Sequence, residues 1–164
     1  MVEWIYLHNK LKTMASRTLL APSQQEAFRR IEGLVKYVNR INVFGPSGVG
    51  KTFLAWVIAK EQGALYLPSP YETMQEAEIV VIDDAPSSRT ECRAICAEAL
   101  EHAHCVILLT REPIDDHLVH VELCVTSEDL QVVAETLRTL TGQSSVSVNP
   151  QPGLLWNLLR VDLG

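Results

Sequence analysis

Eight consecutive residues in the first third of the chain have the side chains and the spacing of a phosphate-binding loop. They read Gly45-Pro46-Ser47-Gly48-Val49-Gly50-Lys51-Thr52, which fits the pattern GxxxxGK[ST]. The glycines let the backbone curl so that its amides face an anion, at the start of a helix whose dipole favours negative charge. The Lys51 ammonium would reach the β- and γ-phosphates, and the Thr52 hydroxyl would bind Mg²⁺. The motif predicts a site for a nucleoside triphosphate with Mg²⁺.

Two acids, Asp83 and Asp84, follow a short apolar run at 79–82. At the carboxyl end of a parallel strand they would lie where open α/β sheets bind their ligands. We assign Asp83 to Mg²⁺, and Asp84 to polarising the water that attacks the γ-phosphate, as a general base. The alternative for Asp84 is a solvated turn residue or a helix cap ahead of Pro86.

Thr110 follows another apolar run, at 105–109, and is the third candidate in the site. Its hydroxyl would lie near the γ-phosphate and could contact the phosphate or the attacking water. A threonine at the end of a buried strand also has an ordinary structural explanation, because its branched side chain favours strands. The two interpretations stay open.

An alternation of strands and helices must position these residues. Apolar runs of strand length occur at 41–44, 64–67, 79–82, 105–109 and 121–125. Helical patterns occur at 51–62, 89–103 and 127–140. We expect Ser88 and Ser127 to cap the N-termini of the last two helices. This alternation predicts an α/β fold with a parallel five-stranded sheet, arranged as a three-layer sandwich.

Further segments flank this core. A helix is expected within residues 2–17, and a second one from Ser23, which would form a capping box with Glu26. Residues 142–153 have the composition of a loop, and we expect 154–161 to form a short apolar helix that packs on the sheet or enters a partner's groove. We expect one domain over 1–164, with leading helices at 1–40, a nucleotide-binding core at 41–126 and a C-terminal helix and tail at 127–164.

Composition limits the class of protein. Of the 164 residues, 47% are hydrophobic and 21% are charged, which is typical of a globular domain and not of a disordered chain. The net charge of −6 provides no overall positive field for nucleic acid, so DNA binding would be local or indirect. No apolar run approaches the roughly 20 residues of a membrane span, and the N-terminus lacks a secretory pattern. These features favour a cytoplasmic protein without a membrane partner.

The cysteines show no paired motif. They are Cys92, Cys96, Cys105 and Cys124. A zinc site could be drawn from three of them with His102 and His104, but the spacing fits no zinc-binding pattern, and buried reduced thiols are favoured. His117 and His120 are expected at the surface, in an acidic turn.

The three motifs together resemble those of the additional-strand (ASCE) P-loop ATPases, and more narrowly the AAA+ fold of bacterial replication initiators and helicase loaders. The resemblance rests on GPSGVGKT at 45–52, IVVIDD at 79–84 and ILLTREP at 107–113, and it covers residues 23–126. It implies adenine as the base and an oligomer or a protein partner. Superfamily 3 viral helicases share the IDD ending, but they typically have Asn where this chain has Thr110.

The resemblance also implies a helical lid and two arginine roles. AAA+ proteins carry a sensor arginine in the lid and present an arginine finger to a neighbouring subunit. Residues 127–164 are too few for such a lid, so we expect it to be truncated or replaced. The candidate arginines are Arg89, Arg93, Arg111, Arg138 and Arg160, each of which has a solvated surface charge as its alternative.

Two functions follow from these features. The first is an ATPase that couples ATP hydrolysis to remodelling a DNA-associated assembly. The alternative is a nucleotide-dependent regulatory or partner-binding module with little turnover of its own, which the missing lid would favour. A nucleotide or small-molecule kinase shares the loop but ranks last, because the sequence has no arginine-rich acceptor lid.

Overall fold

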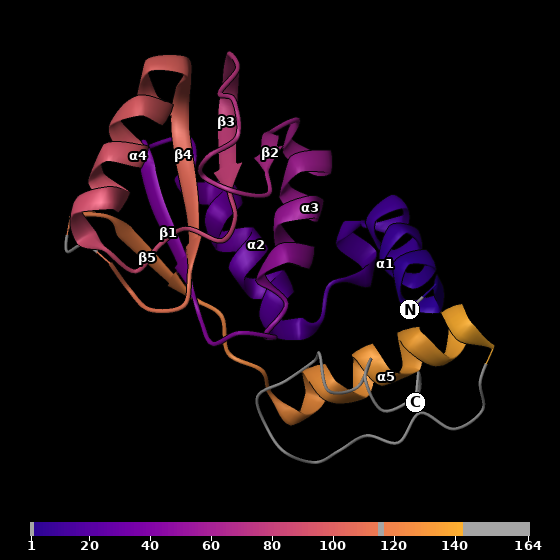
Figure 1. Cartoon of the computed structure of the whole chain (residues 1–164). Coiled ribbons are helices and arrows are strands. Elements are labelled where there is room, and N and C mark those ends of the chain that lie inside the picture. Colours follow the sequence, from indigo (N-terminus) through magenta and orange to yellow (C-terminus); the bar gives the residue numbers. More distant parts are fainter. Residues whose placement is uncertain (1, 115–116, 143–164) are drawn as a thin grey trace.

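A five-stranded parallel sheet forms the centre of the molecule (Figure 1). The computed structural model describes residues 2–114 and 117–142. The strands are β1 (Arg40–Phe44), β2 (Leu65–Leu67), β3 (Ala77–Ile82), β4 (Ala103–Thr110) and β5 (Val119–Glu122). Their order is β2-β3-β4-β1-β5, and every neighbouring pair is parallel. The predicted parallel α/β sheet is confirmed.

The strand order brings the three motifs together. β4 lies between β1, which leads into the phosphate-binding motif, and β3, which ends at the two acids. The register pairs Phe44 with Thr110 and Ile82 with Leu108. Because parallel strands all point the same way, the residues that follow them meet at one edge of the sheet.

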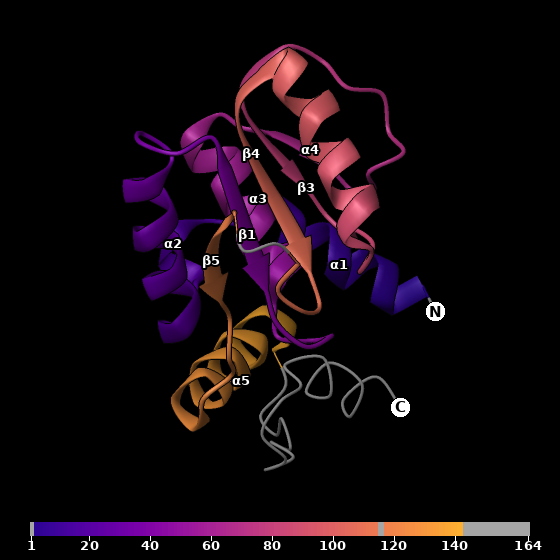
Figure 2. The same ribbon diagram turned by 90° about the vertical axis from the view of Figure 1, so that its left-hand side faces the viewer.

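Helices cover both faces of the sheet (Figure 2). They are α2 (Pro22–Leu34) and α3 (Lys51–Gln62) on one face and α4 (Arg89–His102) on the other. Successive side chains of a strand point to opposite faces. In β4, accordingly, Ile107 and Leu109 pack in the cluster of α2 and α3, whereas Val106 and Leu108 pack in the cluster of α4. This is the predicted three-layer sandwich.

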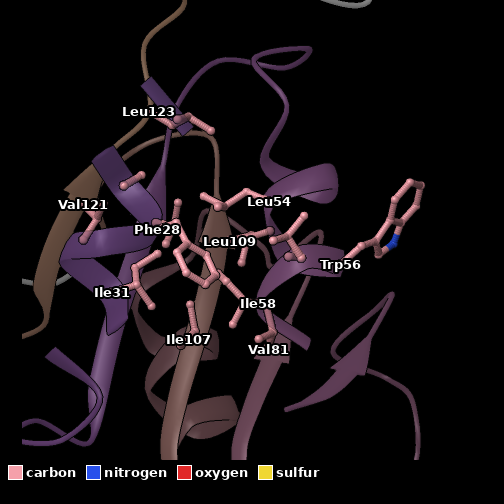
Figure 3. Close-up of a cluster of buried hydrophobic side chains, with 14 of the residues drawn as sticks. Phe28, Ile31, Leu54, Trp56, Ile58, Val81, Ile107, Leu109, Val121 and Leu123 are labelled. Carbon is pink, nitrogen blue, oxygen red and sulfur yellow. The ribbon is translucent and has the colours of Figure 1, made fainter. Parts of the chain in front are cut away.

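The larger of the two clusters is centred on α2 and α3 (Figure 3). Phe28 and Ile31 of α2 and Leu54 and Ile58 of α3 are each about 1% exposed. Trp56 points away from the other labelled side chains. Its ring instead meets His8 of the first helix, edge to face, with 5.0 Å between the ring centroids. The tryptophan therefore joins the core to the N-terminal helix.

Two helices flank the carboxyl edge of the sheet. They are α1 (Val2–Met14), followed by the short η1 (Arg17–Leu19), and α5 (Ser127–Thr141). They share a separate apolar cluster in which Leu7 packs with Leu130 and Leu137. The Lys10 ammonium also donates a hydrogen bond to the carbonyl of Leu140 (3.1 Å). The expected leading helices are confirmed, and the first of them packs against the last described helix.

The start of α2 differs from the prediction. The helix begins at Pro22 with Ala21 as its N-cap, so the expected Ser23–Glu26 capping box is wrong. Proline favours the first helical position, because it has no amide hydrogen and its φ is already helical. The Gln24 side chain instead accepts a hydrogen bond from the Ala21 amide (2.9 Å), and the Ser23 amide donates to Asp129 Oδ1 (2.8 Å).

Two further boundaries need correction. β5 covers Val119–Glu122 and not 121–125, because it can pair with β1 only as far as Phe44, whose carbonyl accepts the last hydrogen bond from the Leu123 amide (2.8 Å). α5 is capped by Thr126 and not by Ser127. The predicted loop at 142–153 (apart from Gly142), the helix at 154–161 and Arg160 lie outside the described residues.

The histidines and cysteines lie as follows. His120 is half-buried on β5, edge-on to Phe44 with ring centroids 5.9 Å apart, so its expected surface position is wrong, whereas His117 is exposed. Cys92, Cys96 and Cys105 are buried, Cys124 is exposed, and none of the four forms a disulfide. Burial raises the pKa of Cys92 and of Cys105 to about 11, so both stay protonated near neutral pH.

Within residues 2–114 and 117–142, no three His, Cys, Asp or Glu side chains form a group that could hold a metal ion. None of the described helices has the length and apolar character needed to cross a membrane.

The fully buried Asp129 ties α5 to α2. Its carboxylate accepts hydrogen bonds from the Ser23 amide and from the Thr126 amide (2.7 Å). An Asp129→Asn change replaces one acceptor with a donor, so we expect the free energy of unfolding to fall by about 2 kcal/mol in urea denaturation. Glu128→Gln, one residue away and exposed, should change it by less than about 0.5 kcal/mol. Equal effects of the two changes would contradict this role.

Candidate functional site

The loop between β1 and α3 has a backbone that only glycine allows at key positions. Gly48 and Gly50 have φ of 87° and 91°, in the left-handed region. A Cβ on Gly45 would collide with the carbonyl oxygen of Leu123, because the loop passes directly over the end of β5. Gly50 is the N-cap of α3, so the curled loop lies at the positive end of a helix. The predicted anion-binding geometry is present.

Lys51 is the first residue of α3 and lies across this loop. Its ammonium donates hydrogen bonds to the carbonyls of Gly45 and Pro46, the second at 2.8 Å. Burial lowers the pKa of Lys51; the Asp83 carboxylate opposes this shift, and the Arg111 guanidinium adds to it. The charged side chains of Lys51, Asp83 and Arg111, which follow β1, β3 and β4, therefore lie near one another at this end of the sheet.

Asp83 is only 8% exposed and is held from several sides. Its Oδ2 accepts hydrogen bonds from the Thr52 hydroxyl (2.7 Å) and from the Tyr66 hydroxyl (3.0 Å). Its Oδ1 accepts one from the Asp84 amide (2.8 Å). A threonine hydroxyl beside a buried carboxylate is an oxygen donor pair that suits Mg²⁺. The two residues assigned to the metal are thus in direct contact, and they fit that ion.

Asp84 has φ of 50°, the one left-handed conformation outside glycine among the described residues. Such a conformation costs energy and is often found at functional sites. The next amide, that of Ala85, bonds to the carbonyl of Leu109 (3.1 Å), which holds the turn against β4. Asp84 is exposed, and it does not cap α4, whose N-cap is Ser88. The carboxylate is therefore available to a ligand.

Thr110 is buried, and its hydroxyl already has two partners. It accepts a hydrogen bond from Asn42 Nδ2 (2.8 Å) and donates one to the carbonyl of Glu112 (2.7 Å). The Asn42 side chain also accepts a hydrogen bond from the Ile114 amide (3.2 Å). This network fixes the turn that carries Arg111. A sensor role for Thr110 stays a prediction, and with its proton committed the hydroxyl can offer a ligand only a lone pair.

One cavity of about 750 Å³ joins these groups to an apolar surface. Its polar end is lined by Ser47, Gly48, Gly50, Lys51, Thr52, Asp83, Asp84, Thr110 and Arg111. Its other end is lined by α1, α3 and α5, through His8, Leu11, Phe53, Trp56, Val133 and Leu137. The volume falls in the range of sites for small ligands and cofactors.

Sequence reasoning missed the apolar half of this cavity and also Tyr66 and Gln24. Gln24, from α2, donates a hydrogen bond to the carbonyl of Gly50 (3.0 Å) and so supports the phosphate-binding loop. Among the described candidate arginines, Arg111 lines the cavity, whereas Arg89, Arg93 and Arg138 do not. A polar residue in the first turn of a helix, or in a three-residue strand, does not by itself reveal such a contact in one sequence.

Solved structures of DNA replication initiators share this fold at low sequence identity. AMPPCP-bound DnaA from Aquifex aeolicus has a TM-score of 0.60 and 14% identity, covering 88% of this chain and 62% of that one. Domain III of the Thermotoga maritima replication initiation protein DnaA has a TM-score of 0.59 and 13% identity, covering 88% and 83%. The present chain thus spans less than two thirds of the Aquifex aeolicus chain.

A further solved structure is titled as the replication initiator DnaA bound to AMPPCP and single-stranded DNA, with a TM-score of 0.54 and 14% identity over 77% of this chain and 54% of that one. No curated protein matches the sequence. The family described as "ATPase family associated with various cellular activities (AAA)" matches residues 41–146. Since this match covers well over half of the sequence and contains all three motifs, the chain belongs to the AAA family of P-loop ATPases.

Proposed function

We propose that the chain binds ATP together with Mg²⁺ and hydrolyses it, as part of a DNA-associated assembly. One observation carries the proposal: a single cavity has the phosphate-binding loop and the Thr52–Asp83 pair at one end and an apolar surface at the other. A nucleoside triphosphate has the same division between its charged phosphates and its flat, weakly polar base.

The polar end would hold the phosphates. The loop amides and the N-terminus of α3 favour negative charge, and the Lys51 ammonium can exchange the carbonyls of Gly45 and Pro46 for phosphate oxygens. Thr52 and Asp83 would hold Mg²⁺, which when bound neutralises charge on the phosphates. Arg111 also lines the cavity and lies near enough to Lys51 to lower its pKa, so it would add a second positive charge there.

The apolar end would hold the base. Leu11 of α1, Phe53 of α3 and Leu137 of α5 line it, and they come from three separate elements. Aromatic and aliphatic side chains of this kind cover the faces of a planar base. Because α1 and α5 both contribute, we propose that 1–164 acts as one domain, in which α1 and α5 cover the apolar end of the site.

Hydrolysis would depend on Asp84. Its exposed carboxylate faces the polar end of the cavity and could accept a hydrogen bond from a water molecule in line with the γ-phosphate. In this proposal one acid, Asp83, serves the metal, and the other, Asp84, serves the water. The alternative is a nucleotide-dependent binding module with little turnover, in which occupancy of the cavity sets the positions of α1 and α5.

The DNA-associated role rests on the similar structures, one of which is bound to single-stranded DNA. The net charge of −6 favours indirect contact, through an oligomer or a protein partner.

Replacing Lys51 with alanine tests binding. The change removes charged hydrogen bonds to the phosphates, so we expect ATP affinity to fall about 100-fold in calorimetric titration. Lys36→Ala is the control, because Lys36 is exposed, lies in the turn between α2 and β1 and does not line the cavity. Equal affinities for the two variants would contradict the assignment of the loop.

Replacing Asp84 with asparagine tests hydrolysis. The amide cannot act as a base, so phosphate release should slow about 10²- to 10⁴-fold while ATP affinity changes little. Glu91→Gln, which removes an exposed carboxylate on α4, should leave both unchanged. A wild-type chain that releases no phosphate with any partner or DNA tested would rule out the hydrolysis claim and leave the binding module.

A further inference from the structure

Tyr66 contacts the metal-binding carboxylate, although it does not line the cavity. It is the central residue of β2, a strand of three residues at the edge of the sheet. Its hydroxyl donates to Asp83 Oδ2, the same oxygen that accepts from Thr52. We propose that Tyr66 is a positioning residue, which orients the Asp83 carboxylate for Mg²⁺ and is itself held by Lys12 of α1. The inference rests on the proposed Mg²⁺–ATP site.

The strand pairing explains how the hydroxyl reaches Asp83. β2 and β3 are parallel neighbours in which Tyr66 pairs with Val81 and Leu67 with Ile82. The ladder extends one step further, from the Asp83 amide to the carbonyl of Leu67 (2.9 Å). Tyr66 is therefore fixed in register with the strand that carries the acid.

The donors around Asp83 fall into two kinds. The Thr52 hydroxyl would also bind Mg²⁺ through an oxygen lone pair, so it would be shared between the metal and Oδ2. The hydroxyl of Tyr66 and the amide of Asp84 have no such second task, and each holds a different oxygen of the carboxylate. These two bonds would keep the carboxylate plane in place as the metal enters. Without Tyr66, Oδ2 would keep only the hydroxyl that is shared with the metal.

The hydroxyl of Tyr66 is suited to this task. The ring is half-buried, and the ordinary pKa of a tyrosine hydroxyl, about 10, lies well above neutral pH. The phenol thus stays protonated, and remains a donor, over the physiological pH range.

The ring of Tyr66 is in turn held from α1. The Lys12 ammonium lies 5.8 Å from the centroid of the Tyr66 ring and 5.9 Å from that of the Trp56 ring. Both distances are within the range of cation–π attraction. The Lys60 ammonium also bonds to the carbonyl of Thr13 (2.9 Å), which fastens the end of α1 to α3. The position of α1 is therefore linked to the metal-binding carboxylate through one tyrosine.

The test measures ATP affinity as a function of Mg²⁺ concentration, and again in EDTA, for the full chain. Tyr66→Phe keeps the ring and removes the hydroxyl. We expect its half-saturating Mg²⁺ concentration to rise about tenfold, with ATP affinity in EDTA unchanged. Tyr71→Phe, which alters an exposed tyrosine in the loop after β2, is the control and should match the wild type.

Lys12→Gln tests the link to α1 without touching the phenol. Its side chain is exposed, so the fold should persist, and we expect a smaller rise in the half-saturating Mg²⁺ concentration, about twofold. Lys12→Gln also provides a test if Tyr66→Phe does not fold. An unchanged Mg²⁺ dependence of ATP binding in Lys12→Gln would then overturn the proposed link from Lys12 through Tyr66 to Asp83.

The outcomes separate the two claims. A wild-type chain that binds no ATP overturns the proposed function, and this inference with it. A wild type that binds ATP in a Mg²⁺-dependent way, with Tyr66→Phe matching Tyr71→Phe, overturns the inference alone. Equal losses for Tyr66→Phe with Mg²⁺ and in EDTA would show a merely structural role, and would also overturn it.

Discussion

The buried carboxylate of Asp83 is the constraint on which the rest of the site depends. A charge in that position is costly unless its oxygens are well bonded, and here the donors come from β2, from α3 and from the turn after β3. These elements must therefore keep their relative positions. Thr52, the phosphate-binding loop and Asp84 line the same cavity, so the arrangement that satisfies one buried charge also brings together the candidate nucleotide site.

A second chain of contacts connects the loop to the C-terminal helix. The carboxylate of Asp129 in α5 accepts a hydrogen bond at the start of α2, and Gln24, one residue further along α2, bonds to the carbonyl of Gly50 in the loop. α1 packs on α5, and both helices line the cavity next to the loop. The two flanking helices are therefore connected to the phosphate-binding loop through α2 and through the cavity wall. A ligand that fills the cavity would contact all of these parts at once.

The sequence predicted the features that are local. The phosphate-binding motif, the paired acids and the five strands each depend on neighbouring residues, and the structure contains all of them. The observed fifth strand differs from the predicted one because its extent is set by the length of β1. The observed start of α2 differs because Pro22 takes the first helical position and Asp129, far along the chain, accepts the Ser23 amide. Tyr66 and the apolar half of the cavity were missed for the same reason: their roles arise from packing between distant segments.

The most direct test of the account is a crystal structure of the full chain with Mg²⁺ and a non-hydrolysable ATP analogue. It should show the phosphates on the amides of 45–52, with Lys51 turned from the loop carbonyls to the phosphates. Mg²⁺ should lie about 2.1 Å from the Thr52 hydroxyl, and the base should lie between α1 and α5. An analogue bound elsewhere, or a Lys51 that keeps its bonds to Gly45 and Pro46 with the analogue present, would contradict the account.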